Sequence, residues 1–282
     1  MGAPLPIVRI VPDLRARIAA WRKAGASIGL VPTMGALHEG HLSLVRAAKA
    51  QCDCVAASVF VNPKQFAPHE DFERYPRNEA EDATLLASAG CDLLYAPSPE
   101  AMYPPGFATS VSVAEISAPL EGEMRPHFFG GVATVVSKLL LQSLPDKAFF
   151  GEKDYQQLLV IQHMARDLDI PVDIQGLPTV REPDGLALSS RNFYLSPQER
   201  LIAGALNLIM REAISAFHAG APIDALEQEA LQRLMRAGFD KVDYIVIRDA
   251  QSLAPLADRH TRARILAAAW LGKTRLIDNM AV

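Results

Sequence analysis

The apolar positions of the chain follow two patterns, and the change between them falls near residue 180. Before that point, short apolar runs typical of buried strands are separated by stretches whose apolar residues recur at helical spacing. These runs predict a strand or extended arm at residues 6–10, strands at 27–31, 54–61, 92–96, 147–150 and 172–175, and an alternating edge strand at 109–113. Helical spacing predicts helices at residues 12–24, 41–50, 78–89 and 131–141, and another that begins within 151–157. Strands joined by helices favour a parallel sheet, so we predict a Rossmann-like α/β domain over residues 1–180.

After residue 180 the pattern is that of helices followed by an antiparallel hairpin. Ser196, Pro197 and Glu199 have the order of a capping box, which predicts a helix from there to about residue 219. A second helix is predicted at residues 223–237, and strands at 242–248, 264–271 and 275–279. We therefore predict a smaller α+β domain over residues 181–282.

The composition is that of a globular protein and argues against several classes of function. Of the 282 residues, 50% are hydrophobic and 21% are charged, which allows a large buried core. The net charge of −4 provides no basic excess, so we expect no nucleic-acid partner. The chain shows neither an apolar run of about 18 residues nor the pattern of a signal peptide, so we expect no membrane association. Cys52, Cys54 and Cys91 lack the spacing of a disulfide framework or a zinc site, which favours a cytoplasmic protein.

The strongest candidate for chemistry is the strand-to-helix junction at residues 31–41, which reads Val-Pro-Thr-Met-Gly-Ala-Leu-His-Glu-Gly-His. Ligands of open α/β sheets bind at the carboxyl ends of the strands, where the next helix attracts anions with its first turn. His38 and His41 are three residues apart, so on a first helical turn both lie on one side and can bind the same polyanion. Gly40 lacks a Cβ, so a phosphate or a flat base can approach the backbone closely. The alternative is a pair of surface histidines beside a turn, with glycines that serve only the turn geometry.

Two further segments carry groups suited to phosphate. A charged turn stands between a predicted strand and a predicted helix, and it comprises Gly151, Glu152, Lys153 and Asp154. It is not a Walker A loop, but a lysine at a strand end can reach phosphate. A second segment follows the predicted boundary and comprises Leu188, Ser189, Ser190 and Arg191. Its two hydroxyls and guanidinium form a compact set of donors, although an exposed polar loop has the same composition.

Two glutamines are candidates for a small polar substrate. Gln65 follows the strand predicted at residues 54–61, and Gln157 lies at the head of the helix that follows Lys153. Neutral amides can both donate to and accept from hydroxyls and carboxylates. By composition alone, a glutamine is more often an exposed surface residue, and this is the alternative for both side chains.

Six motifs, in order, resemble the pantothenate synthetase (pantoate–β-alanine ligase) family of the nucleotidylyltransferase superfamily. They lie at residues 32–41, 59–65, 75–77, 131–136, 151–157 and 184–192, and so span nearly the whole chain. The resemblance implies an ATP-dependent ligase that joins pantoate to β-alanine through a pantoyl adenylate, releasing AMP and pyrophosphate. It also implies a homodimer formed through the first domain, with the second domain acting as a lid.

The resemblance assigns roles to the candidate residues. His38 and His41 are expected at the phosphates, with His41 as the catalytic acid for the departing pyrophosphate, while Gln65 and Gln157 are expected to hold pantoate. The implied ATP site comprises Met34, Gly35, Ala36, Leu37, His38, Glu39, Gly40, His41, Gly151, Glu152, Lys153, Asp154, Val180, Leu188, Ser189, Ser190 and Arg191. Magnesium is expected to arrive with ATP and to be held mainly by phosphates. No residue is therefore assigned as a metal ligand, and neither Glu81 nor Asp82 is given that role.

One loop departs from the family pattern. Where Arg-Pro-Gly-His-Phe is expected, this chain has Arg125-Pro-His-Phe-Phe, so His127 and Phe128 replace the glycine and the histidine. The role of a histidine in this loop is therefore in question, whereas Arg125 is retained.

Two other functions stay open at this point. One is a different adenylate-forming enzyme of the same superfamily, such as a tRNA synthetase, although the chain has no basic anticodon-binding domain. The other is a nucleotide-binding regulatory module without catalytic activity.

Overall fold

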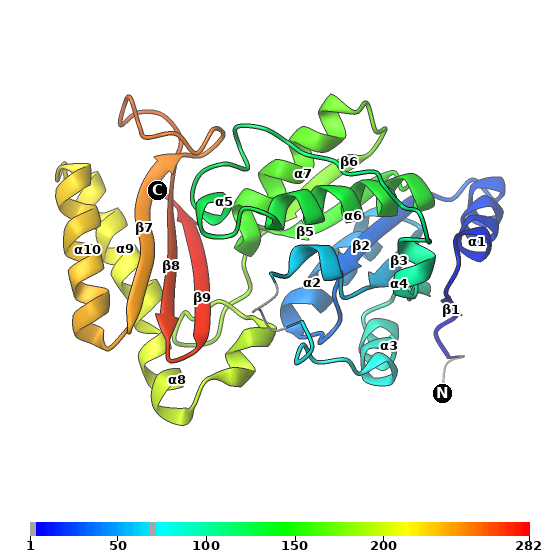
Figure 1. Ribbon diagram of the computed structural model, residues 1–282, viewed down its shortest axis with the longest axis horizontal. Coiled ribbons are helices and arrows are strands. Elements are labelled where there is room, and N and C mark those ends of the chain that lie inside the picture. Colours follow the sequence, from blue (N-terminus) through cyan, green and yellow to red (C-terminus); the bar gives the residue numbers. More distant parts are fainter. Residues whose placement is uncertain (1–3, 68–71) are drawn as a thin grey trace. The chain divides into compact units, whose positions relative to one another are not determined.

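The chain forms two compact units in the computed structural model, which describes residues 4–67 and 72–282. Unit 1 comprises Met1–Gly151 and Gln156–Leu177, and unit 2 comprises Glu152–Tyr155 and Pro178–Val282 (Figure 1). The chain therefore passes from one unit to the other three times. Nothing in the sequence pattern indicated that the turn around Lys153 groups with the C-terminal residues.

Unit 1 is built on a six-stranded parallel sheet, which confirms the predicted α/β class. The strand order is β1-β4-β3-β2-β5-β6. The strands are β1 (Ile7–Val8), β2 (Ile28–Thr33), β3 (Cys54–Val59), β4 (Leu93–Tyr95), β5 (Lys147–Gly151) and β6 (Asp173–Leu177). Because β2 and β3 are buried on both faces, they read as continuous apolar runs rather than as alternating ones.

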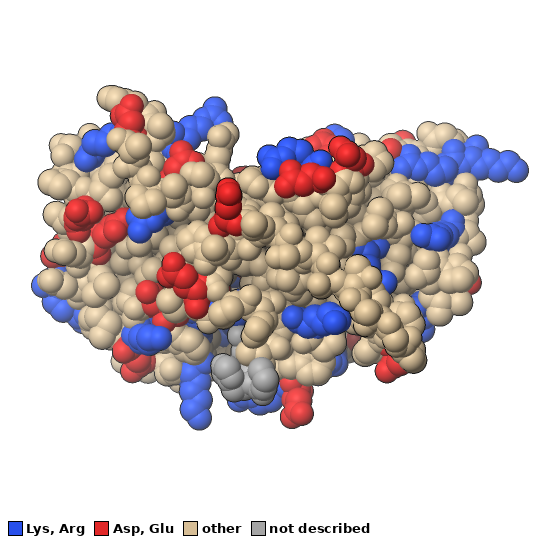
Figure 2. All heavy atoms as spheres, turned by 45° about the horizontal axis from the view of Figure 1, so that its top comes forward, with Lys and Arg blue, Asp and Glu red and all other residues tan. Residues whose placement is uncertain are grey.

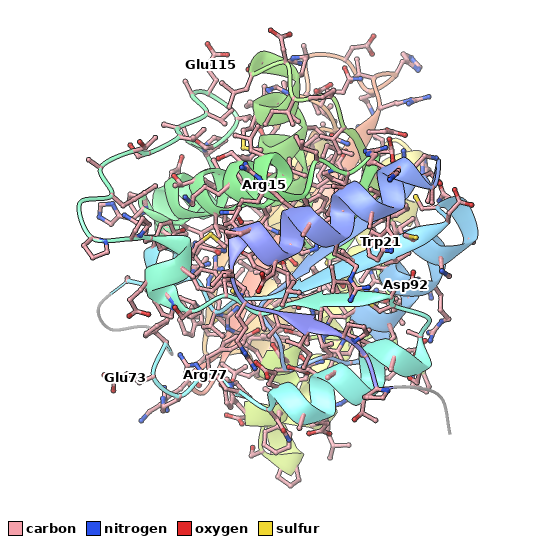
Figure 3. All side chains as sticks on the ribbon, turned by 90° about the vertical axis from the view of Figure 1, so that its right-hand side faces the viewer. Arg15, Trp21, Glu73, Arg77, Asp92 and Glu115 are labelled. Carbon is pink, nitrogen blue, oxygen red and sulfur yellow. The ribbon has the colours of Figure 1, made fainter. Side chains whose placement is uncertain are left out.

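Helices cover both faces of this sheet (Figure 1). They are α1 (Val11–Lys23), α2 (Glu39–Gln51), α3 (Glu79–Ser88), α4 (Pro99–Met102), α5 (Glu121–Met124), α6 (Phe128–Ser143) and α7 (Tyr155–Asp167). Right-handed crossovers place α2 and α3 on one face of the sheet and α1 and α6 on the other. The contacts agree with this placement, because α2 contacts α3 and α1 contacts α6. On α1, Leu14 and Ile18 are buried, whereas Trp21 is only partly buried (Figure 3).

The loop before α3 is folded by an arginine of one family motif. Arg77 donates to the carbonyl oxygens of Phe72, at 2.8 Å, and of Glu73 and Tyr75, both at 3.3 Å. Figure 3 labels Arg77 and Glu73 in this segment. Arg77 thus has a structural role, because it donates hydrogen bonds to backbone carbonyl oxygens that are not paired within a sheet.

The edge strand predicted at residues 109–113 is wrong, since this segment has no strand pairing. The backbone N–H of Val111 instead donates to the Thr134 hydroxyl of α6, at 3.0 Å. Alternation alone predicted the strand, but a helix side chain rather than a neighbouring strand satisfies this backbone.

Unit 2 is a small α+β fold, as predicted. Its antiparallel sheet has the order β7-β8-β9, with β7 (Lys241–Asp249), β8 (Ala263–Leu271) and β9 (Thr274–Ala281). The helices are α8 (Pro197–Ala203), α9 (Ala205–His218) and α10 (Ile223–Ala237).

The single helix predicted from Ser196 to residue 219 is interrupted. The capping box at Ser196 and Glu199 is present, but Gly204 separates α8 from α9. A Cβ at Gly204 would lie 2.9 Å from Asp184 Oδ2, and that carboxylate pairs with Arg200 at 2.5 Å. A close tertiary contact, which helical periodicity does not reveal, therefore coincides with the break.

The surface carries both signs of charge. Lys and Arg side chains are interspersed with Asp and Glu across the face shown in Figure 2. In the described part of the chain, no helix is both long enough and apolar enough to cross a membrane. The three cysteines are free thiols, and burial raises the pKa of Cys91 to about 11.

Candidate active site

The motif loop begins where β2 ends. The Thr33 hydroxyl donates to the Ser58 carbonyl of β3 at 2.7 Å and accepts from the Gly35 N–H at 3.2 Å. The next two residues are left-handed, with φ +82° at Gly35 and φ +51° at Ala36. A Cβ at Gly35 would lie 2.8 Å from Asp82 Oδ2, so both the dihedral and the close approach favour glycine.

Asp82 of α3 holds this loop from the neighbouring strand–helix unit. Its carboxylate accepts from the backbone N–H of Leu37 at 2.9 Å and of Ala36 at 3.2 Å. The side chain is 2% exposed, and burial raises the pKa of this carboxyl despite the two hydrogen bonds. Sequence reasoning left Asp82 without a role because the contact spans 45 residues and has no local signature.

His38 and His41 form the predicted pair on the first turn of α2. His38 is the N-cap residue, and its Nδ1 accepts from the Gly40 N–H at 3.1 Å. His41 Nδ1 accepts from the His38 N–H at 3.3 Å, which completes a reciprocal capping box. The ring centroids are 4.2 Å apart. The prediction that both imidazoles lie on one side of the first turn is therefore confirmed.

This arrangement determines which nitrogen carries the proton. Because Nδ1 accepts a backbone hydrogen bond in both rings, the proton of each neutral imidazole lies on Nε2. The N–H groups of Gly40 and His41 are already used by the cap and by the His38 carbonyl. An anion at this helix terminus would thus meet the partial positive end of α2 rather than those N–H groups. Glu39 pairs with Arg46 along the helix.

Gln65 lies at the carboxyl end of β3, in the 3-10 helix η1 (Pro63–Gln65). Its Oε1 accepts from Asn62 Nδ2 at 2.9 Å. Asn62 is fully buried and also donates to the Gly131 carbonyl at 3.1 Å and accepts from the Tyr103 hydroxyl at 2.9 Å. Asn62 therefore positions Gln65, since its own polar atoms are satisfied by the protein.

The first turns of α6 press directly on η1. A Cβ at Gly131 would lie 2.2 Å from the Lys64 carbonyl oxygen and 3.0 Å from the Gln65 nitrogen. Arg125 donates to the Gln65 carbonyl at 3.1 Å, and its guanidinium lies 3.9 Å from the Phe128 ring centroid. Phe128, which stands where the family histidine was expected, therefore contacts the retained arginine.

Gln157 is distinguished from its neighbour by its environment. Gln156 is buried and bonds to the backbone of Ile116, Pro119 and Glu121, so it is structural. Gln157 is partly buried on α7 and, among the described residues, has no hydrogen-bond partner. Of the two, only Gln157 has an amide that the protein does not already use.

Unit 2 carries the other predicted phosphate ligands. Lys153 lies in the 3-10 helix η2 (Glu152–Asp154), with an ammonium 3.6 Å from Asp154. Ser189 caps the 3-10 helix η3 (Ser190–Tyr194) by accepting from the Arg191 N–H at 3.3 Å. The carbonyl of Val180 accepts from the Leu188 N–H at 3.0 Å, so these predicted residues are paired across a short turn.

The predicted residues are divided between the two units. Unit 1 combines the Met34–His41 segment with Gln65, at the carboxyl ends of the adjacent parallel strands β2 and β3. Unit 2 contains Lys153, Val180 and the Leu188–Arg191 segment. Within residues 4–67 and 72–282, no group of three or more His, Cys, Asp or Glu could hold a metal ion.

Replacing Asp82 by asparagine is expected to disturb the motif loop. Asn has one acceptor oxygen in place of two, so one of the N–H groups of Ala36 and Leu37 loses its partner. We expect the rate of a reaction that uses His38 and His41 to fall about tenfold, because both residues follow this loop directly. Steady-state rates of Asp82→Asn and wild type measure the effect.

Glu81→Gln is the matched control, since it removes a charge from an exposed side chain of the same helix. Burial raises the pKa of Asp82 above its unfolded value, so ionised Asp82 lowers stability above its folded pKa, and this cost disappears on acidification. The unfolding free energy of wild type relative to Asp82→Asn should therefore fall as the pH rises from the unfolded pKa of an aspartate, about 4, through the raised folded pKa. An unchanged rate, or a difference that does not depend on pH, would contradict this account.

Comparison with known proteins identifies close relatives over the full length. A sequence model described as pantoate-beta-alanine ligase matches residues 6–281. The chain is 60% identical over 285 residues to a pantothenate synthetase of Caulobacter vibrioides, covering 100% of both chains. It is 58% identical over 282 residues to that of Paramagnetospirillum magneticum, covering 100% of this chain and 99% of the relative.

Solved structures agree. A crystal structure of pantothenate synthetase from Thermus thermophilus has a TM-score of 0.92 at 46% identity, covering 98% of this chain and 99% of that one. Pantoate-beta-alanine ligase from Francisella tularensis, complexed with beta-gamma ATP and beta-alanine, has a TM-score of 0.83 at 36% identity. That match covers 98% of this chain and 97% of the other.

Proposed function

This chain belongs to the pantoate-beta-alanine ligase family, and we propose that its paired histidines and strand-end glutamine bind ATP and pantoate. The protein is a ligase that forms pantothenate from pantoate and β-alanine with ATP. Of the three functions that the sequence left open, family membership selects this one. The observation that carries the residue assignment is the His38–His41 pair, whose Nδ1 atoms are both held by backbone N–H groups.

The reaction is proposed to proceed in two steps. A pantoate carboxylate oxygen attacks the α-phosphorus of ATP, the bond to the β-phosphate oxygen breaks, and pyrophosphate leaves. The β-alanine amine then attacks the acyl carbon, AMP leaves with the bridging oxygen, and the amine loses a proton. Adenylation is needed because a free carboxylate has no good leaving group, whereas AMP is one.

The residues of unit 1 are proposed to act on the first step. Negative charge builds on the departing pyrophosphate, and donors fixed in advance around it stabilise that transition state. His38 and His41 supply Nε2–H donors at the positive end of α2, with His41 as the acid that acts on the leaving group. Met34, Gly35 and Gly40 line the nucleotide site, and Gln65 and Gln157 hold pantoate, with Gln65 also near β-alanine.

The residues of unit 2 are proposed to neutralise phosphate charge. Lys153 and the set Ser189, Ser190 and Arg191 provide an ammonium, two hydroxyls and a guanidinium, and Val180 contacts adenine. Residues 181–282 are proposed to act as a mobile lid, and their place in a separate compact unit supports this role. A closed lid would protect the adenylate from water.

Magnesium is proposed to enter with ATP as part of the substrate. The described residues contain no cluster of carboxylates or histidines suited to a resident ion, and magnesium is commonly held by phosphates and water. No step above is routed through it. A homodimer and a cytoplasmic location likewise stay predictions of the sequence, which sedimentation and cell fractionation would measure.

Exchange of labelled pyrophosphate into ATP tests the first step directly. We expect exchange that requires pantoate and proceeds without β-alanine, because adenylate formation precedes the amine. Omission of pantoate is the control. Absence of pantoate-dependent exchange, under conditions where calorimetry shows ATP binding, would contradict the proposed adenylate route.

A further inference from the structure

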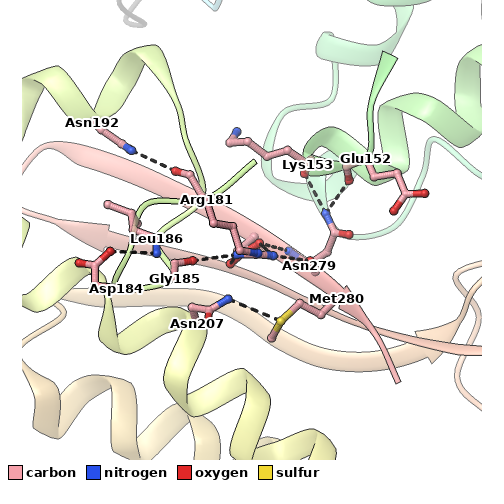
Figure 4. A network of polar contacts seen from close by, with 12 residues as sticks. Glu152, Lys153, Arg181, Asp184, Gly185, Leu186, Asn192, Asn207, Asn279 and Met280 are labelled. Carbon is pink, nitrogen blue, oxygen red and sulfur yellow. Dashed lines mark hydrogen bonds and ion pairs between the residues drawn. The ribbon is translucent and has the colours of Figure 1, made fainter. Parts of the chain in front are cut away.

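The turn that carries Lys153 is held by one side chain of β9. Asn279 Nδ2 donates to the carbonyl oxygens of Glu152 and Lys153, both at 2.8 Å. Asn279 Oδ1 accepts from Arg264 Nε at 2.7 Å, and the residue is only 3% exposed. Figure 4 shows the amide meeting both carbonyls while the Lys153 side chain extends away from them. The backbone of the turn is therefore fixed, and the ammonium is left to project from it.

Arg264 of β8 also contacts this turn. Its guanidinium donates to Glu152 Oε2 at 2.7 Å and lies 3.7 Å from the ring centroid of Tyr155. The Tyr155 hydroxyl in turn donates to the Ala250 carbonyl at 2.8 Å. Contacts within unit 2 therefore hold both ends of the segment Glu152–Tyr155.

Asp278, the residue next to Asn279, holds a second turn of unit 2 through Arg181. Asp278 is 4% exposed and makes a double hydrogen bond with Arg181, at 2.6 and 2.9 Å. Arg181 also donates to the carbonyls of Gly185, at 3.0 Å, and of Asn279, at 3.2 Å. Arg181 also forms an isolated antiparallel β-bridge with Ala187, which lies two residues before Ser189. The Arg181–Asp278 ion pair therefore anchors the turn that leads into the Ser189–Arg191 segment.

We propose that Asn279 is a positioning residue for Lys153. Together with Asp278, it fixes the lysine turn and the Ser189–Arg191 segment to one strand, so their mutual spacing is built into unit 2. This inference rests on the proposed function, in which both sets bind the phosphates. Cations held in place before the reaction need not reorganise as charge develops, which is the advantage that such support provides.

The chemistry of the side chain explains why an asparagine serves here. Two consecutive carbonyl oxygens and one guanidinium N–H surround the position, so it requires two donors and one acceptor. An amide has both, whereas a carboxylate would set negative charge against two carbonyl oxygens. Alanine would leave the two carbonyls and the Arg264 Nε–H without this partner.

A double-mutant cycle tests whether Asn279 acts through Lys153. We expect Asn279→Ala to slow pantoate-dependent pyrophosphate exchange roughly tenfold to a hundredfold in kcat, and to change the KM for pantoate less than about threefold. In the Lys153→Ala background the same substitution should cost less than about threefold, because the group that it positions is gone. Equal losses in both backgrounds, or a normal rate for Asn279→Ala, would overturn the proposal.

The outcome also separates this proposal from the function on which it rests. If Lys153→Ala exchanges at the normal rate, the assigned role of Lys153 fails and the inference falls with it. If Lys153→Ala is slow and Asn279→Ala is normal, only the inference fails. Leu276→Ala is the matched control, because it removes a buried apolar side chain from the same strand without touching the turn.

Hydrogen exchange provides a readout that is independent of catalysis. Amides of the 152–157 segment should exchange at least about tenfold faster in Asn279→Ala than in Leu276→Ala, once the change in global stability, measured from the slowest amides of each variant, is subtracted. If Asn279→Ala does not fold, Arg264→Lys replaces it, because lysine cannot bond Asn279 and Glu152 in the same geometry. Unchanged exchange and an unchanged rate in the folded variant would overturn the proposal.

Discussion

His41→Ala is expected to reduce the rate of pantoyl adenylate formation by about 10² to 10⁴-fold, the range typical of a lost acid–base group. The imidazole supplies an Nε2–H donor at the site where pyrophosphate charge develops, and alanine supplies none. The variant also loses the acceptor for the His38 N–H, which costs roughly 1 kcal/mol of helix capping. That cost is small for a chain of this size, so the fold should persist. Pantoate-dependent pyrophosphate exchange measures the rate, and circular dichroism the fold.

His260→Ala is the control for this experiment, since His260 is exposed in a loop of unit 2. A third variant, His41→Gln, keeps an N–H donor near the Nε2 position but has no acid–base chemistry at neutral pH. Recovery of most of the rate by glutamine would mean that hydrogen bonding is sufficient, whereas continued loss would support proton transfer. A near-normal rate for His41→Ala would refute the assigned role.

Gly131→Ala is expected to disrupt the pantoate end of the site. The new methyl group would lie 2.2 Å from the Lys64 carbonyl oxygen, so α6 and η1 must separate. Asn62 would lose its 3.1 Å bond to the Gly131 carbonyl, and Gln65 would move with it. We expect a destabilisation of about 1 to 3 kcal/mol and a rise of up to about 10²-fold in the KM for pantoate. Denaturant unfolding and initial rates at varied pantoate concentration measure the two effects.

The adjacent glycine offers a closely matched control. A Cβ at Gly130 would have no atom within 4 Å, yet the residue lies in the same helical turn and carries the same helix propensity. Gly130→Ala should therefore leave the KM for pantoate unchanged and stabilise the helix slightly. Similar behaviour of the two variants would show that the close approach at Gly131 does not matter.

The parallel sheet could be predicted because its strands are short buried runs joined by helices. The position of both histidines on one side of the helix start could be predicted as well, since it depends on a three-residue spacing that is visible in the sequence. The strand expected at residues 109–113 was wrong because alternation cannot distinguish a sheet neighbour from the Thr134 hydroxyl of a helix. The helix expected after Ser196 was too long because its interruption at Gly204 coincides with a side chain from residue 184.

The supporting residues of both candidate sets were beyond the reach of the sequence. Asp82 meets the motif loop across 45 residues, and Asn279 meets the lysine turn across 126. Each is a single polar residue within an otherwise ordinary helix or strand, with no periodicity or motif to mark it. Such contacts depend on how distant elements are brought together, which only the fold reveals.

The assignment of Glu152–Tyr155 to unit 2 has a consequence for the exchange of protein parts. A fragment of residues 178–282 would keep all three strands of its sheet, yet Asn279 would lose its bonds to the carbonyls of Glu152 and Lys153, and Arg264 its bond to the Glu152 carboxylate. A chimera that takes this segment from a relative would join two halves of one hydrogen-bonding network from different parents. Residues 152–155 and 178–282 should therefore be exchanged together in any chimera, although more than twenty residues separate them in the chain.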